Sequence, residues 1–109
     1  MAEKAFDEIL LGSVDDALAS LGESARQAIY FHLEKKFKVE KREIPRKLDN
    51  FEKGLEKIFG PGAKFIEILI MKELHGKVGQ PLEWNESKEL VFVAYVTAAK
   101  RAFLEKEAN

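Results

Sequence analysis

Apolar residues recur every three or four positions along most of this chain, and this period limits the fold more than any other feature. The clearest case is residues 48–59, where the positions between the apolar ones are mostly charged. The apolar positions there are Leu48, Phe51, Leu55, Ile58 and Phe59. Such spacing places them on one face of a helix. Gly54 inside this run costs about 1 kcal/mol relative to alanine, and a close crossing with a second helix would explain its presence.

The N-terminal part of the chain predicts two short helices. One covers about residues 3–11, and Gly12 separates it from the next. Ser13 is the expected N-cap of the second helix, with Asp16 three residues further on, as in a capping box. Gly22 is expected to end this helix as a left-handed cap.

Two more helices are expected from Ser24 onward, and the second of them is the run that contains Gly54. Ser24 starts the third helix, where Gln27 would complete a capping box, and the helix stops near Lys38. The pair at 44–45, Ile-Pro, opens the fourth helix, because the N–H that proline lacks would be unpaired at that position.

Residues 61–77 predict the central helix of the bundle. Pro61 follows a glycine and can occupy a first helical turn. The apolar residues of this segment are Phe65, Ile66, Ile68, Leu69, Ile70, Met71, Leu74 and Val78. They cover most of the circumference, and a helix that is apolar nearly all round is buried on several sides.

The last helix is expected at about residues 86–105. Residues 90–96 are rich in β-branched side chains and could form a buried strand. We reject a strand because no second strand exists to pair with it. The sequence therefore predicts an all-α bundle of five or six helices, a single domain over residues 1–109 with its core at about 13–105.

Charge and composition limit the cellular location and the classes of partner that we expect for the protein. The 18 basic and 19 acidic residues give a formal net charge of −1, so no general attraction to nucleic acid or acidic membranes is expected. The chain has no cysteine, no stretch like a signal peptide, and no apolar stretch of the roughly 20 residues that span a bilayer. We expect a cytoplasmic protein. Charged residues make up 34%, which fits either a thermophilic source or ordinary solvated helix faces.

The chain lacks a pattern typical of catalysis. His32 and His75 have no metal-ligand spacing around them, and no serine lies in a nucleophile turn. Every glutamate falls where a solvated helix face is expected. We therefore predict no metal, no cofactor and no enzymatic activity. Two buried carboxylates, or His32 beside His75, would favour an enzyme instead.

Two groups of residues are candidates for binding. The first is a set of aromatic residues beyond what narrow helix stripes need, which we assign to a protein interface or a homodimer. The surplus aromatic residues are Tyr30, Phe31, Trp84, Phe92 and Tyr95, and the predicted interface residues are Tyr30, His32, Trp84 and Tyr95. For Trp84 itself, a lid over the core is favoured over an anchor at an interface. Apolar residues on several faces of the last helix also favour a partner groove or a second copy.

The second group is a basic segment at residues 35–47, which could contact the phosphates of a nucleic acid. Its members are Lys35, Lys36, Lys38, Lys41, Arg42, Arg46 and Lys47. Intervening acids dilute its charge, and the helix that follows has no Arg/Asn/Gln cluster to read bases. Nucleic-acid binding is therefore the alternative to a protein-interaction role.

Two stretches carry a resemblance to a known family. They are the run Ile-Tyr-Phe-His-Leu-Glu at 29–34 and the turn Phe-Gly-Pro-Gly-Ala-Lys at 59–64. Over about residues 13–104 the chain resembles the small archaeal output-domain family, the Nitrosopumilus-type output domain. The resemblance implies an archaeal helical protein of unassigned function that is coupled to signalling proteins. It implies no catalytic residues.

Overall fold

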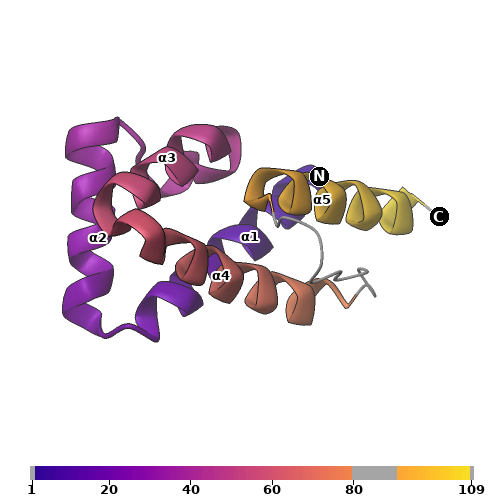
Figure 1. The fold of residues 1–109 in the computed structure, drawn as a ribbon. Coiled ribbons are helices and arrows are strands. Elements are labelled where there is room, and N and C mark those ends of the chain that lie inside the picture. Colours follow the sequence, from indigo (N-terminus) through magenta and orange to yellow (C-terminus); the bar gives the residue numbers. More distant parts are fainter. Residues whose placement is uncertain (1, 80–90, 109) are drawn as a thin grey trace.

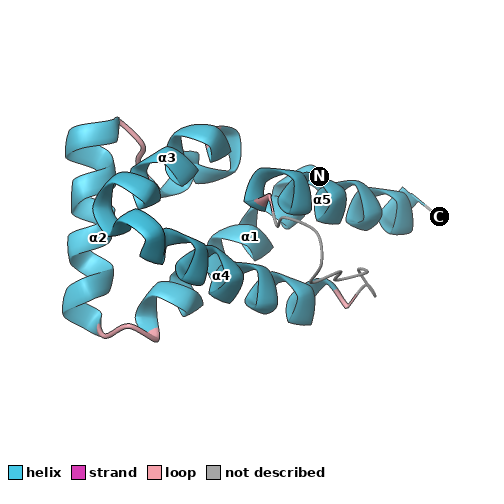
Figure 2. Cartoon of the chain, in the orientation of Figure 1, coloured by secondary structure: helices cyan, strands magenta, loops and turns pink. Residues whose placement is uncertain are grey.

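The computed structural model describes residues 2–79 and 91–108, and within them the chain forms five α-helices and no strand (Figures 1 and 2). The α-helices are α1 (Ala2–Ala19), α2 (Glu23–Phe37), α3 (Leu48–Phe59), α4 (Ala63–Val78) and α5 (Phe92–Ala108). Two short 3₁₀-helices, η1 (Lys41–Arg46) and η2 (Gly60–Gly62), precede α3 and α4. The predicted all-α bundle is confirmed, and residues 92–96 are helical.

Helix α4 lies at the centre of the fold, as its sequence predicts. It packs against α1, α3 and α5. Ile70, Met71 and Leu74 are almost completely buried in these contacts. Phe65 is 61% exposed, so the burial of this helix is incomplete near its start. In Figure 1, α2 stands at one end of the molecule, and α5 extends at the other end beside the N-terminus.

The predicted break at Gly12 is wrong, because α1 continues through it to Ala19. Ser13 caps no helix here. It is buried, and its hydroxyl donates a 2.8 Å hydrogen bond to the carbonyl of Ile9, one turn earlier. A mid-helix glycine costs about 1 kcal/mol. Burying large side chains on both sides of it, such as Phe6 and Val14, offsets that cost.

Three predicted helix starts are also corrected. Helix α2 begins at Glu23, with Gly22 as its N-cap at φ 107° and ψ 150°, and no side chain caps it. The amide of Gln27 donates to the Glu23 carboxylate instead of completing a capping box on Ser24. Pro45 lies inside η1 and Pro61 inside η2, so α3 begins at Leu48 and α4 at Ala63. In both places the proline belongs to a 3₁₀ turn ahead of the helix.

The close helix crossing predicted at Gly54 is confirmed. A Cβ atom at this position would lie 2.6 Å from Leu33 Cδ2 and 3.3 Å from Phe37 Cδ2, both on α2. Only a residue without a side chain lets α2 and α3 approach this closely. The crossing therefore fixes which parts of the two helices face each other.

Two predictions fall partly or wholly beyond this description. Trp84, Leu90 and the expected start of the last helix at residue 86 lie outside the described residues. Among the described helices, none combines the length and the apolar character needed to cross a membrane.

Candidate functional site

A pocket of about 300 Å³ opens beside the crossing of α2 and α3. It is lined by His32, Lys36 and Phe37 from α2 and by Lys57 and Ile58 from α3. Lys57 and Ile58 follow Gly54 by three and four residues, so they project from the same side of α3 as the glycine. The close approach at Gly54 therefore brings the two sets of lining residues together.

The lining of this pocket is cationic. It includes two lysines and a histidine and no acidic residue. Within the described part of the chain, neither Lys36 nor Lys57 lies within 4.0 Å of a carboxylate. By contrast, Lys77 and Lys100 lie 2.7 and 2.8 Å from their carboxylate partners. The pocket thus carries positive charge that nearby side chains do not compensate.

Phe31 extends the pocket into a larger surface on α2. Its side chain is 57% exposed, and its ring lies edge-on to the His32 ring at 5.8 Å. The ammonium of Lys35, one turn further on, lies 5.9 Å from the Phe31 ring centre. We call Phe31, His32, Lys35, Lys36 and Lys57 the α2 surface. An exposed aromatic ring among cations is typical of an interface anchor.

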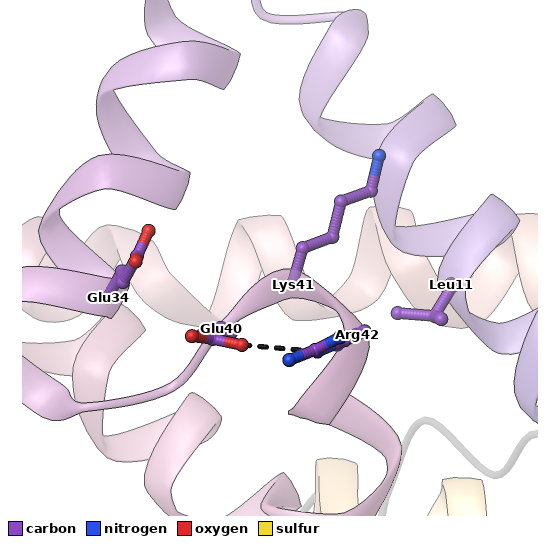
Figure 3. Close-up of a pocket in the computed structure, with 5 residues that line it drawn as sticks. All are labelled: Leu11, Glu34, Glu40, Lys41 and Arg42. Carbon is purple, nitrogen blue, oxygen red and sulfur yellow. Dashed lines mark hydrogen bonds and ion pairs between the residues drawn. The ribbon is translucent and has the colours of Figure 1, made fainter.

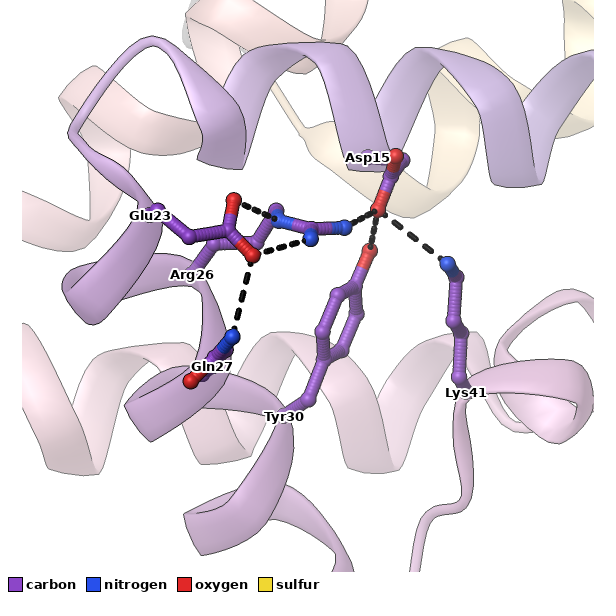
Figure 4. Close-up of polar contacts among 6 residues, drawn as sticks. All are labelled: Asp15, Glu23, Arg26, Gln27, Tyr30 and Lys41. Atoms are coloured by element: carbon purple, nitrogen blue, oxygen red, sulfur yellow. Dashed lines mark hydrogen bonds and ion pairs between the residues drawn. The ribbon is translucent and has the colours of Figure 1, made fainter.

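Tyr30, a predicted interface residue, takes part in an internal polar contact (Figure 4). Its hydroxyl donates to Asp15 Oδ1 at 3.0 Å. The same oxygen accepts bonds from Arg26 Nη1 at 2.7 Å and Lys41 Nζ at 3.1 Å. Partial burial raises the pKa of Asp15, but these three bonds outweigh it, and the pKa lies below its usual value. Tyr30 therefore helps to join α1 to α2, and its own pKa is raised, first by burial and then by Asp15.

The basic segment is divided by the fold. Lys35 and Lys36 lie on the α2 surface, whereas Lys41 pairs with Asp15. Further along, Arg42 in η1 lies 3.2 Å from the carboxylate of Glu40, the residue that precedes η1 (Figure 3). At its end, Lys47 pairs with Glu43 at 3.1 Å and donates to the carbonyl of Lys38. Internal pairing thus compensates much of the charge beyond α2.

Three other hollows have mixed linings. Two lie on η1, with volumes of about 460 and 500 Å³, and a third of about 400 Å³ lies on α5. The first contains Glu34, Glu40, Lys41, Arg42 and Leu11 (Figure 3). The second contains Asp7, Arg42, Glu43, Arg46 and Lys47. The third contains Thr97, Lys100, Arg101, Leu104 and Glu105. Each therefore has acids beside its cations, unlike the pocket at the crossing.

The remaining predicted residues lie elsewhere. Tyr95 is half-buried on α5, and its hydroxyl donates to the carbonyl of Met71 on α4 at 3.4 Å. Burial raises the pKa of this tyrosine. His75 is partly buried near the end of α4, and within the described residues no group of three or more acids and histidines is placed to hold a metal ion. The structure thus brings His32 together with Lys36, and leaves Tyr30 and Tyr95 in contacts within the fold.

Sequence reasoning omitted two residues of the α2 surface. Lys57 belongs to the charged face of α3, and nothing in its sequence context separates it from Lys53. Phe31 was among the aromatic residues beyond what narrow helix stripes need, but it was not among the predicted interface residues. The signal that could have found Lys57 is Gly54, because a crossing there implies that residues near 57 face α2.

One further expectation is wrong, since Glu67 does not lie on a solvated face. It is 6% exposed on α4, and one of its oxygens is buried without a partner among the described residues. It is hydrogen-bonded to Glu52 on α3. Neither carboxyl is among the residues that line the four hollows described above.

Comparison of the chain with protein-family models, with curated proteins and with solved structures gave no match. The resemblance to the archaeal output-domain family stays a prediction. The feature of the protein that bears on its function is therefore the geometry of the α2 surface.

Proposed function

We propose that this protein is an interaction module whose α2 surface binds an acidic segment of a partner protein. One observation carries the proposal: the exposed Phe31 ring contacts the ring of His32, which lines a pocket with uncompensated positive charge. An apolar side chain of the partner would pack on Phe31. Its carboxylates would face the lysines.

Charge complementarity favours an acidic partner. The α2 surface presents three lysines, of which Lys35 lies over Phe31 while Lys36 and Lys57 line the pocket. Matching negative charges steer a partner to the surface and disfavour partners of the wrong sign. A buried aromatic ring at the centre of such a contact contributes most of the binding energy in many interfaces.

The same charges disfavour a homodimer built on this surface. A two-fold dimer places the same patch of both copies face to face. The α2 surfaces of two copies would then bring like charges together, which costs free energy. Self-association, if it occurs, would use another face.

The nucleic-acid alternative has weaker support. It relies on the basic segment at 35–47, but Lys41, Arg42 and Lys47 are each paired with a carboxylate. Such pairs reduce the number of cations available to phosphates, and the salt dependence of binding scales with that number.

The identity of the partner follows from the resemblance rather than from geometry. An output domain implies a signalling protein as the partner, in an archaeal and thermophilic setting. The cysteine-free sequence fits a reducing compartment such as the cytoplasm. The high content of Lys and Glu fits a thermophilic source.

A random peptide library displayed on phage tests the proposal. The wild-type protein should enrich peptides that are acidic and contain at least one large apolar residue. Phe31→Ala and Lys36→Glu should each abolish most of this enrichment. Phe65→Ala is the matched control for the first variant, because Phe65 is exposed to a similar extent on another helix. Lys72→Glu, at an exposed position of α4, is the control for the second.

Two results would contradict the proposal. One is enrichment of neutral or basic peptides. The other is equal enrichment by Phe31→Ala and the wild type. Sedimentation across protein concentration adds a separate check, because a dimer that Lys36→Glu strengthens would show that two copies meet through the α2 surface.

A further inference from the structure

We propose that the pocket between α2 and α3 is a binding site for a phosphoryl dianion, the charged group of a phosphate monoester. Lys36 and Lys57 supply its positive charge, and His32 lines it beside them. The group could belong to a phosphorylated side chain of the partner or to a free ester. The first source rests on the proposed function, and the second does not.

The placement of the cations fits a single anion. Lys36 and His32 are four residues apart on α2, so they lie on one face of that helix. Lys57 approaches from α3, on the other side of the same pocket. A volume of about 300 Å³ lies at the small end of ligand pockets, which suits a phosphoryl group and a short substituent.

The amount of charge favours a dianion over a carboxylate. A phosphate monoester carries about −1.5 to −2 at neutral pH. Two lysines supply the matching positive charge, and lysine binds phosphate as a compact point charge. A single carboxylate would leave one lysine uncompensated. The imidazole of His32 adds a further hydrogen-bond donor.

The apolar walls strengthen the interaction. Phe37 and Ile58 are half-buried, and both line the pocket. Apolar walls lower the local dielectric constant, and the attraction between ions rises as that constant falls. They also offer packing for the substituent of an ester, so an aryl ester should bind more tightly than inorganic phosphate.

The two lysines of the pocket also repel each other. Lys36 from α2 and Lys57 from α3 bring two like charges to one pocket. By contrast, four other lysines among the described residues each have a carboxylate partner: Lys41, Lys47, Lys77 and Lys100. An anion that relieves the repulsion would bind the folded state alone and stabilise it.

The test is an NMR titration of the two imidazole rings at constant pH and ionic strength. The probes are inorganic phosphate, phenyl phosphate and acetate. His32→Gln identifies the His32 signals, and His75 on α4 is an internal reference. Phosphate and phenyl phosphate should shift the His32 signals saturably, phenyl phosphate at lower concentration, while the His75 signals stay fixed.

Variants assign the site. Lys57→Gln should weaken phosphate binding about tenfold or more, because it removes a charge-assisted hydrogen bond. Lys72→Gln, which removes an exposed charge elsewhere on α4, should bind as the wild type does. Equal movement of both histidines, an equal response to acetate, or unchanged binding by Lys57→Gln would each overturn the inference.

A final experiment distinguishes a phosphoryl group on a partner protein from a free phosphate ester. It also distinguishes failure of the proposed function from failure of the phosphoryl site. A serine-containing peptide from the library is compared with its phosphoserine form and with phenyl phosphate. Tighter binding of the phosphopeptide assigns the group to a partner, and tighter binding of phenyl phosphate assigns it to a free ester. Failed peptide selection with intact phosphate binding would contradict the proposed function only. The reverse result would contradict only the phosphoryl site.

Discussion

Glu67 on α4 is hydrogen-bonded to Glu52 on α3, so the central interface of the bundle contains a carboxyl pair. Glu67 is 6% exposed, and its second oxygen is buried without a partner among the described residues. Burial, followed by the negative charges of Glu52 and Glu56, raises the pKa of Glu67 to about 7, although Lys64 acts in the opposite direction. Burial also raises the pKa of Glu52. Two carboxyl groups this close share one proton rather than both ionising.

This pair predicts that the protein becomes less stable as the pH rises. The folded state holds a proton on Glu67 up to about pH 7, whereas an ordinary glutamate releases it near 4.5. The free energy of unfolding should therefore fall as the pH rises from 4.5 to about 7 and level off above that range. The loss is at most about 3 kcal/mol. Urea unfolding at a series of pH values measures it.

Glu67→Gln isolates the contribution of this carboxyl. An amide cannot ionise, so the variant should lose most of the slope between pH 4.5 and 7 and should match or exceed the wild type above pH 7. Glu8→Gln removes an exposed carboxyl of α1 and should keep the wild-type slope. An unchanged slope in Glu67→Gln would show that other groups cause the pH dependence.

Gly54→Ala should destabilise the protein by about 1–3 kcal/mol. The added Cβ would lie 2.6 Å from Leu33 Cδ2, and Leu33 is completely buried and has little room to move. Overpacking of this kind costs more than the roughly 1 kcal/mol that alanine gains in helix propensity. Thermal or urea unfolding checks the prediction.

Gly76→Ala is the matched control for this crossing. Gly76 is also inside an α-helix, but a Cβ there meets nothing within 4 Å. Alanine should therefore stabilise the protein by about 0.5–1 kcal/mol. A loss of stability in Gly54→Ala together with a gain in Gly76→Ala would support the close crossing of α2 and α3. A stabilising Gly54→Ala would mean that α2 and α3 lie further apart than described.

These glycines show how far the sequence predicts the fold. The stripe around Gly54 is local, so it predicts the buried face of α3 and the crossing without knowledge of the partner helix. Gly12 is also a glycine between apolar residues, and a helix break was predicted there, but α1 continues through it. Its helix continues because Phe6 and Val14, on either side, are buried against other elements. That outcome depends on contacts between distant segments, which a local pattern does not contain.

The site is less predictable than the fold for the same reason. His32 and Lys36 belonged to separate hypotheses, and only the crossing unites them with Lys57. Glu67 was expected in solvent, although it lies in the middle of the apolar run 65–71. That position was a usable signal: a charged residue within a helix predicted to be buried on several sides must itself be at least partly buried.

Asp15→Asn should destabilise the contact between α1 and α2. One Asp15 oxygen accepts hydrogen bonds from Arg26, Tyr30 and Lys41. An amide would leave Lys41 without its carboxylate partner and Arg26 with Glu23 alone. We expect a loss of about 1–2 kcal/mol in urea unfolding at neutral pH. Asp16→Asn, which breaks only the more exposed pair with Lys77, should cost at most about 1 kcal/mol. Equal losses for the two variants would contradict a special role for Asp15.

Lys38→Gly should stabilise the protein, because Lys38 ends α2 in a left-handed conformation. Its φ of 57° and ψ of 36° are unfavourable for a residue with a side chain. Its N–H donates to the Leu33 carbonyl and its carbonyl accepts from Lys47, and glycine keeps both backbone bonds. Relief of the strain exceeds the entropic cost of glycine, so a gain of about 0.5–1 kcal/mol is expected in thermal unfolding. Lys35→Gly, inside the same helix, should cost about 1 kcal/mol. If both variants lose stability to the same extent, α2 does not end at this residue in solution.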